Sequence, residues 1–254
     1  MKQMLSVLLL SSYRLAVRSG VLQKPWAQRL FLSVYGHYKA LFEARHADRL
    51  AAWVPRAGVV FDVGANVGFF TLKFARWVGP QGRVVALEPE HANVEQLRIA
   101  LARAALAAQV SVVRAAAADQ VGSAHLELNP FHPGDHKLAS AGVPVALTTI
   151  DAQVQALTLT RVDLVKIDVQ GAEQMVLAGA RATLQRWRPV LFIEIDDLHL
   201  RRYGSSARQL IGDLFDQGYG AHRMDNKTLS PSMSLDSACA WVAACGYVDL
   251  LFLP

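Results

Sequence analysis

From residue 58 onward, short apolar runs rich in β-branched residues alternate with longer amphipathic segments. The short runs predict buried strands at 59–63, 84–87, 110–113, 164–167, 190–195 and 247–253. The amphipathic segments predict helices at 69–78, 89–106 and 206–215. Alternation of strands and helices is typical of an α/β fold with a doubly wound, mostly parallel sheet that carries helices on both faces.

Two segments depart from this alternation. The turn-rich stretch at 119–150 is too long for a simple connection, and loops of that length often carry function. Residues 1–54 precede the first strand, and apolar side chains recur there at helical spacing. We therefore predict a basic, helical N-terminal arm at 1–54 and an α/β domain at 55–254.

The net charge of +5 is distributed unevenly along the 254 residues. Residues 1–49 contain eight Lys or Arg but only two Asp or Glu, whereas the rest of the chain has a net charge of −1. A nucleic-acid-binding domain would be basic itself, so nucleic acid is not expected as a partner. Basic and aromatic residues interleave along the arm, which leaves two interpretations: packing on the α/β domain, or a peripheral membrane-surface contact through residues 1–50.

The two cysteines and the N-terminal residues indicate in which cellular compartment the protein is expected. Cys239 and Cys245 form neither a disulfide framework nor a zinc pattern, which is typical of a reducing cytoplasm. The apolar run at 4–10 is far shorter than the ~20 residues needed to span a bilayer. We expect a cytoplasmic protein that touches the inner membrane surface only if the arm binds lipid; the oligomeric state is left open.

The strongest chemical signal is the segment DVGANVG at 62–68, where the first strand meets the first helix. Gly64 and Gly68 allow the backbone to approach a ligand, and a helix N-terminus offers amide donors. Asp62 is a carboxylate inside an apolar strand, where it is costly to bury without a partner. Glu88 ends the second strand and can accept hydrogen bonds from both hydroxyls of a ribose. These residues predict a nucleoside-containing cofactor.

The same turn bears on which cofactor binds. NAD fits poorly, because Asn66 replaces the second glycine of the GxGxxG pattern and the third glycine is missing. S-adenosylmethionine has no phosphate, and its amino-acid end needs an acid such as Asp62 together with backbone groups. An NAD-linked oxidoreductase and a non-catalytic cofactor-binding module stay open as alternatives.

Further segments extend the pattern: VVALEPE at 84–90, DLVKIDVQGAE at 163–173 and FIE at 192–194. Together with FDVGANVGFFTL at 61–72, they resemble the FkbM-type S-adenosylmethionine-dependent methyltransferases, which commonly have Glu where this chain has Gln170. The resemblance implies a class I methyltransferase (Rossmann-like) fold with a seven-stranded sheet. It also implies methyl transfer to a hydroxyl of a carbohydrate, glycolipid or polyketide-like acceptor. The predicted cofactor-binding residues are Asp62, Gly64, Asn66, Gly68, Glu88 and Asp168.

The substrate hydroxyl that receives the methyl group loses its proton as it attacks, so the protein needs a general base beside that hydroxyl. Asp168 and Glu194 end strands at the carboxyl edge of the sheet, where ligands bind. With His136 of the long loop, they are the catalytic candidates. Lys166 shares a strand face with Asp168 and needs an anionic partner, for which Asp62, Asp168 and Glu194 are candidates. A divalent metal would also activate a hydroxyl, but no motif with metal-ligand spacing supports one.

Overall fold

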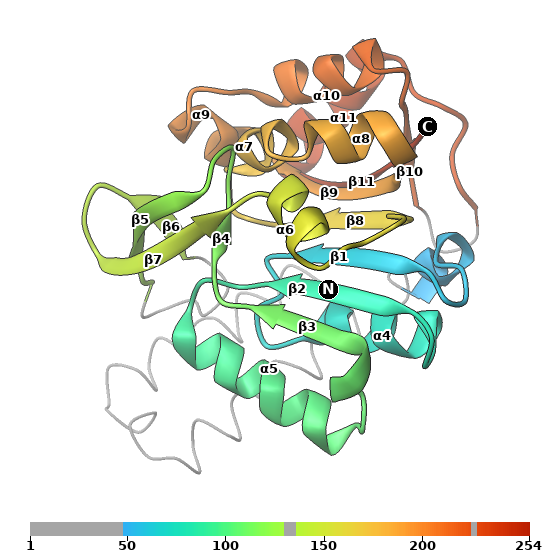
Figure 1. Cartoon of the computed structure of the whole chain (residues 1–254). Coiled ribbons are helices and arrows are strands. Elements are labelled where there is room, and N and C mark those ends of the chain that lie inside the picture. The colour runs from blue at the N-terminus through green and yellow to red at the C-terminus, as the bar shows by residue number, and fades with distance from the viewer. Residues whose placement is uncertain (1–47, 130–135, 225–227) are drawn as a thin grey trace, which may run out of the picture.

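A computed structural model describes residues 48–129, 136–224 and 228–254 (Figure 1). Of the predicted arm at 1–54, only residues 48–54 fall within this range. The interpretation of the arm as a membrane-surface contact therefore concerns residues that mostly lie outside it. Among the described helices, none is long and apolar enough to cross a membrane.

The main sheet of the described residues has seven strands. Their spatial order is β10 (Gly220–Arg223), β11 (Tyr247–Leu253), β9 (Val190–Asp196), β8 (Leu164–Ile167), β1 (Val59–Val63), β2 (Arg83–Leu87) and β3 (Val110–Val113). The five strands from β9 to β3 are parallel to one another, whereas β11 is antiparallel to both of its neighbours. The predicted doubly wound, mostly parallel sheet is confirmed, and β10 is the strand that the apolar pattern did not locate.

Helices cover both faces of this sheet (Figure 1). One face packs against α4 (Phe69–Val78), α5 (His91–Arg103) and the 3-10 helix η2 (Asp48–Trp53), and η3 (Ala107–Gln109) follows α5. The other face packs against α6 (Ile150–Ala156), α7 (Glu173–Ala178), α8 (Arg181–Trp187), α9 (Asp197–Arg202), α10 (Ala207–Asp216) and α11 (Leu235–Cys245). The central strands are therefore buried on both sides, which is why they appear in the sequence as nearly continuous apolar runs.

The alternation of side chains along β1 and β8 places the two charged residues of these otherwise apolar strands, Asp62 and Lys166, on the same face of the sheet. In β1, Phe61 packs in the core beneath α7 and α8, whereas Val60 packs in the core beneath α4. Asp62 follows on the α4 side, because successive side chains point to opposite faces. Lys166 lies on the same side of β8, and the parallel register pairs it directly with Asp62.

Two of the three predicted helices keep their place but change their ends. The helix expected at 89–106 is α5, and it begins only after Glu90, whose carboxylate accepts from the amides of Ala92 and Asn93. This N-cap satisfies amides that the first helical turn leaves without partners. The helix expected at 206–215 is α10, with Ser206 as its N-cap.

The segment 119–150, expected only to be more than a simple connection, forms most of a second sheet. This sheet has the order β4 (Ala116–Ala117), β7 (Val143–Thr148), β5 (Gly122–Glu127) and β6 (Lys137–Ala139). It stands at one side of the molecule, at the end of the main sheet toward which β3 runs (Figure 1). Its strands bury few side chains, chiefly Leu126 and Leu147, so they lack the long apolar runs by which the other strands were recognised.

The end of the N-terminal arm packs on the domain. Leu50 in η2 is fully buried, and it shares a core with Val54, Phe74 of α4 and Leu251 of β11. Within the described residues, 48–54 thus belong to the hydrophobic structure of the α/β domain.

Candidate cofactor-binding and active site

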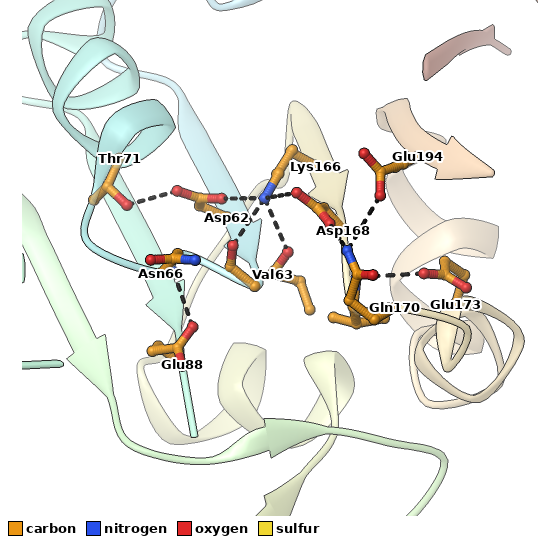
Figure 2. Close-up of polar contacts among 12 residues, drawn as sticks. Asp62, Val63, Asn66, Thr71, Glu88, Lys166, Asp168, Gln170, Glu173 and Glu194 are labelled. Atoms are coloured by element: carbon orange, nitrogen blue, oxygen red, sulfur yellow. Dashed lines mark hydrogen bonds and ion pairs between the residues drawn. The ribbon is translucent and has the colours of Figure 1, made fainter. Parts of the chain in front are cut away.

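The predicted site residues other than His136 lie where β1, β2, β8 and β9 reach their carboxyl ends (Figure 2). The turn at 64–68 connects β1 to α4, and the turn at 168–172 connects β8 to α7. These turns lie side by side because β1 and β8 are neighbouring parallel strands, and the amide of Asp168 donates to the carbonyl of Val63. Two segments about 100 residues apart in the chain therefore share one edge of the sheet.

Asp62 is fully buried and has two polar contacts that offset the cost of its burial. The hydroxyl of Thr71 in α4 donates to Oδ2 at 2.5 Å. The ammonium of Lys166 lies 3.3 Å from Oδ1. The sequence predicted a partner for this carboxylate and Lys166 as a candidate, but it did not indicate Thr71.

Lys166 connects the two turns (Figure 2). Its ammonium donates to the carbonyl of Gly64 at 2.9 Å and more weakly to that of Val63 at 3.4 Å. It also lies 3.5 Å from Oδ2 of Asp168 and 5.3 Å from the centre of the Phe70 ring. Two of the three candidate partners of this buried lysine, Asp62 and Asp168, are confirmed. The side chain also holds the turn at 64–68 against the end of β8.

The two glycines of the turn are required by space as well as by conformation. Gly64 has φ +77°, and a Cβ atom there would lie 1.9 Å from the carbonyl oxygen of Asp168. Gly68 has φ +97° at the N-cap of α4, and a Cβ atom there would lie 2.5 Å from Leu97 of α5. The absence of a side chain at these two positions therefore lets the turn pack against Asp168 and against Leu97.

Glu88 lies at the end of β2, opposite the turn. Its carboxylate accepts from the amide of Asn66 at 2.9 Å, the amide of Glu90 at 3.0 Å and the side-chain amide of Asn93 at 3.3 Å. Burial raises the pKa of Glu88 to about 7, although these hydrogen bonds favour the ionised form. A carboxylate oxygen accepts more than one hydrogen bond, so Glu88 is suited to receive the two hydroxyls of a ribose.

Asp168 and Glu194, the two carboxylates predicted to serve the acceptor, both lie beside the side chain of Gln170. The side-chain amide of Gln170 lies 3.3 Å from Oδ1 of Asp168 and 3.3 Å from Oε1 of Glu194 (Figure 2). Glu173 stabilises the turn at 168–172, because its Oε1 accepts hydrogen bonds from the amides of Val169 and Gly171. Burial raises the pKa of Glu173 to about 7.

His136 lies on the segment that leads into β6 and is not among the residues labelled in Figure 2. Its Nδ1 accepts from the amide of Asn129 at 3.1 Å. In a neutral imidazole this bond requires the ring proton to be on Nε2, which is then a donor. The role of His136 in catalysis stays a prediction.

A metal centre finds no support in the part of the chain that the structure describes. No group of three or more His, Cys, Asp or Glu side chains is arranged there to hold a metal ion. The two carboxylates on the acceptor side are instead bridged by an amide.

Comparison with known proteins now decides the family. A model of the methyltransferase FkbM domain matches residues 62–248. The chain belongs to the FkbM methyltransferase family. The match runs from the buried aspartate of β1 to β11, so it includes both turns of the site and the second sheet. The class I methyltransferase fold expected from the sequence is confirmed by the family match and by the strand order of the main sheet.

This FkbM-family chain is similar to several known methyltransferases. It is 28% identical over 176 residues to the 31-O-demethyl-FK506 methyltransferase FkbM of Streptomyces tacrolimicus, covering 56% of this chain and 66% of that protein. It is 43% identical over 70 residues to a catechol O-methyltransferase of Mycobacterium tuberculosis, covering 28% of this chain and 32% of that protein. The chain thus spans less than two thirds of the length of either relative.

A solved FkbM methyltransferase from Methylobacillus flagellatus is 17% identical, with a TM-score of 0.49. That alignment covers 78% of this chain and 43% of the solved one.

S-adenosylmethionine is the methyl donor of this family, and the residues of the site fit it. The turn at Gly64 packs directly on the backbone of Asp168, and Glu88 is a buried carboxylate that accepts a hydrogen bond from the amide of Asn66 in the same turn. The acidic groups around the turn suit a ligand that carries an ammonium and a sulfonium charge.

Sequence reasoning missed Thr71, Asn93 and Tyr203 as contributors to this FkbM-family site. Thr71 and Asn93 are buried polar residues within helices, and each contacts one of the two buried acids of the cofactor side. In the sequence, each of these two residues is recognisable as a polar residue on the apolar face of its helix. Tyr203 donates to the carbonyl of Leu138 and thereby ties α9 to β6, a contact without any local signal.

Proposed function

We propose that this protein is an S-adenosylmethionine-dependent O-methyltransferase that acts on a hydroxyl of a carbohydrate, glycolipid or polyketide-like acceptor. The observation that carries the proposal is the contact between the two turns. Gly64 of the cofactor turn approaches the backbone of Asp168 so closely that no side chain fits between them. The cofactor site is therefore directly beside the two carboxylates that can receive a proton.

The names of the relatives support transfer to oxygen. The Streptomyces protein is named for methylation at an oxygen of FK506, and the mycobacterial protein is named for methylation of a catechol oxygen. The acceptor edge of this chain supports the same chemistry, because it presents carboxylates and an amide that form hydrogen bonds with hydroxyl groups.

The residues have distinct roles in this proposal. When bound, S-adenosylmethionine supplies an electrophilic methyl group and leaves as S-adenosylhomocysteine. Asp62, Gly64, Asn66, Gly68 and Glu88 form its binding site, with Lys166 as the side chain that holds the turn in place. The proton of the acceptor hydroxyl leaves as the carbon–oxygen bond forms, and Asp168 or Glu194 receives it.

Titration calorimetry tests the cofactor half of this proposal. We expect the protein to bind S-adenosylmethionine and S-adenosylhomocysteine but not NAD. Glu88→Gln should weaken binding by about 10- to 100-fold, because hydrogen bonds to a charged group are lost. The matched control is Glu95→Gln, since Glu95 is an exposed side chain that pairs with Arg98 on α5. NAD binding in place of S-adenosylmethionine would favour the oxidoreductase alternative.

The transfer itself is tested by mass spectrometry of glycan and lipid extracts. Extracts of a strain that lacks the gene should contain an acceptor that gains one methyl group when the protein and S-adenosylmethionine are added. Asp168→Asn and Glu194→Gln should reduce this gain while leaving the fold intact. Cofactor binding without transfer to any extract component would support the non-catalytic binding module instead.

A further inference from the structure

A buried ion pair lies next to the turn at 64–68 (Figure 2). Asp62 on β1 and Lys166 on β8 are register partners, and Nζ of the lysine is 3.3 Å from Oδ1 of the aspartate. Both side chains are almost completely removed from solvent. Charges at this depth are stable only where polar contacts replace their hydration, so each contact of the pair helps to set where both side chains lie.

Thr71 gives the carboxylate of this pair a hydrogen bond from a third element. It is fully buried in the first turn of α4, and its hydroxyl donates to Oδ2 of Asp62 at 2.5 Å. Among the described residues, no group donates a hydrogen bond to Oδ1, the oxygen that faces Lys166. A hydroxyl that donates to a carboxylate forms a charge-assisted bond, which is shorter and stronger than one between neutral groups. The Thr71 hydroxyl therefore fixes the rotation of the Asp62 side chain.

Lys166 contacts the cofactor turn as well as the aspartate. Its ammonium donates to the carbonyl of Gly64 at 2.9 Å. The ring of Phe70, the neighbour of Thr71 in α4, has its centre 5.3 Å from the same ammonium. The first turn of α4 thus touches both members of the ion pair, and a continuous chain of contacts runs from α4 through β1 and β8 to the turn.

The backbone of the turn is held from two sides. The amides of Gly64 and Ala65 donate to the carbonyl of Leu87 at the end of β2, each at 3.0 Å. The carbonyl of Gly64 is held on the opposite side by Lys166. Glycine has more backbone freedom than any other residue, so the hold of Lys166 limits the conformations that this turn can adopt. A ligand binds more tightly to a turn that is already ordered than to one that must become ordered on binding.

We propose that Thr71 is a positioning residue for the cofactor: its hydroxyl fixes the Asp62 carboxylate, which places Lys166 against the carbonyl of Gly64. Asp62 then acts on the cofactor through Lys166 and the turn, because its own side chain is fully buried. The inference deepens the cofactor half of the proposed function and rests on it, whereas the acceptor has no part in it.

Two substitutions at position 71 separate the hydroxyl from the shape of the side chain. Thr71→Val keeps the branched shape without the hydroxyl, whereas Thr71→Ser keeps the hydroxyl. The matched control is Thr183→Val, because Thr183 is also buried in a helix and its hydroxyl donates to Oδ1 of Asp151 at 2.6 Å. Asp151 lies in the first turn of α6 and has no part in the chain of contacts to the cofactor turn. Urea denaturation shows that each variant is folded, and both valine variants should unfold at lower urea concentration than the wild type.

Titration calorimetry with S-adenosylmethionine distinguishes positioning from general destabilisation. We expect the dissociation constant to rise about 10-fold in Thr71→Val, as for the loss of one hydrogen bond. Thr71→Ser and Thr183→Val should stay within about 3-fold of the wild type. Wild-type affinity in Thr71→Val would overturn the proposal. So would an equal loss of affinity in both valine variants, or an equal loss in Thr71→Ser and Thr71→Val, because neither pattern depends on the Thr71 hydroxyl.

Hydrogen exchange without any ligand gives an independent test. Deuterium uptake by a peptide spanning residues 62–68 should become about 5-fold faster in Thr71→Val, since the turn loses part of its hold. Thr71→Ser and Thr183→Val should exchange like the wild type in this peptide. Unchanged exchange in Thr71→Val would show that the hydroxyl does not order the turn, and the proposal would be wrong. If the wild type does not bind S-adenosylmethionine, the proposed function fails, and the exchange rates still decide whether Thr71 positions the turn.

Discussion

At the scale of single residues, the cofactor turn depends on backbone positions that exclude a side chain. Gly64 and Gly204 have nearly the same φ, +77° and +75°. A Cβ atom at Gly64 would meet the backbone of β8, whereas one at Gly204 would have no neighbour within 4 Å among the described residues. The pair therefore separates conformational strain from steric exclusion.

Gly64→Ala should cost more stability than Gly204→Ala. Both variants have the strain of a left-handed alanine, about 1 kcal/mol, but only Gly64→Ala must also push β1 and β8 apart. We expect a loss of unfolding free energy of about 3 kcal/mol or more for Gly64→Ala, together with loss of S-adenosylmethionine binding. Urea denaturation and calorimetry on the two variants check this, and equal stabilities would contradict the steric argument.

At the scale of elements, the second sheet is joined to the active site through α9. The hydroxyl of Tyr203, just after α9, donates to the carbonyl of Leu138 in β6 at 2.9 Å. The ring of the same tyrosine lies against Gly171, within the turn that carries Gln170. The strand that follows His136 is thus tied to the acceptor side by a residue that is remote from it in sequence.

Removal of this hydroxyl should loosen β6 and leave the main sheet intact. In Tyr203→Phe, we expect hydrogen exchange of a peptide spanning residues 136–140 to become about 5- to 10-fold faster, because one hydrogen bond is lost. Tyr219→Phe is the matched control, since the Tyr219 hydroxyl donates to the carbonyl of Pro189 instead. Mass spectrometry of deuterium uptake compares the two variants; the same uptake by this peptide in both would rule out the tie between α9 and β6.

At the scale of the whole molecule, two buried carboxyl groups couple folding to pH. Burial raises the pKa of both Glu88 and Glu173 from 4.5 to about 7. The folded state therefore binds these protons more tightly than the unfolded state does. Their contribution to stability is full below about pH 4.5 and is lost as the pH rises through about 7. At neutral pH, the burial of Glu88 and Glu173 therefore contributes less to the free energy of unfolding than it does in acid.

The free energy of unfolding should accordingly decrease between about pH 5 and pH 8. Glu173→Gln mimics the protonated side chain at every pH, so its stability relative to the wild type should increase over this range by up to about 3 kcal/mol. Urea denaturation of both proteins at several pH values measures the difference. A difference that is constant with pH, or that falls as the pH rises, would show that the Glu173 carboxyl is not protonated preferentially in the folded state.

Much of the site was predictable because its residues are local exceptions to a strong pattern. Asp62 and Lys166 stand out as charged residues within apolar strands, and the parallel order of β1 and β8 follows from the alternation of strands and helices. The second sheet was not predictable in the same way, because β5 and β6 bury few side chains and have no regular apolar alternation. Its strands are defined by pairing, which a single sequence does not display.

The sequence alone determined the doubly wound sheet, the bare glycine turn and the set of acids at the carboxyl edge, since each depends on residue types at short spacing. Only the tertiary structure decided which of these groups touch. Thr71 meets Asp62 because α4 packs back onto β1, and Gln170 reaches Glu194 because β8 and β9 end side by side. Contacts between distant segments depend on how helices and strands pack, and a short motif carries no information about that packing.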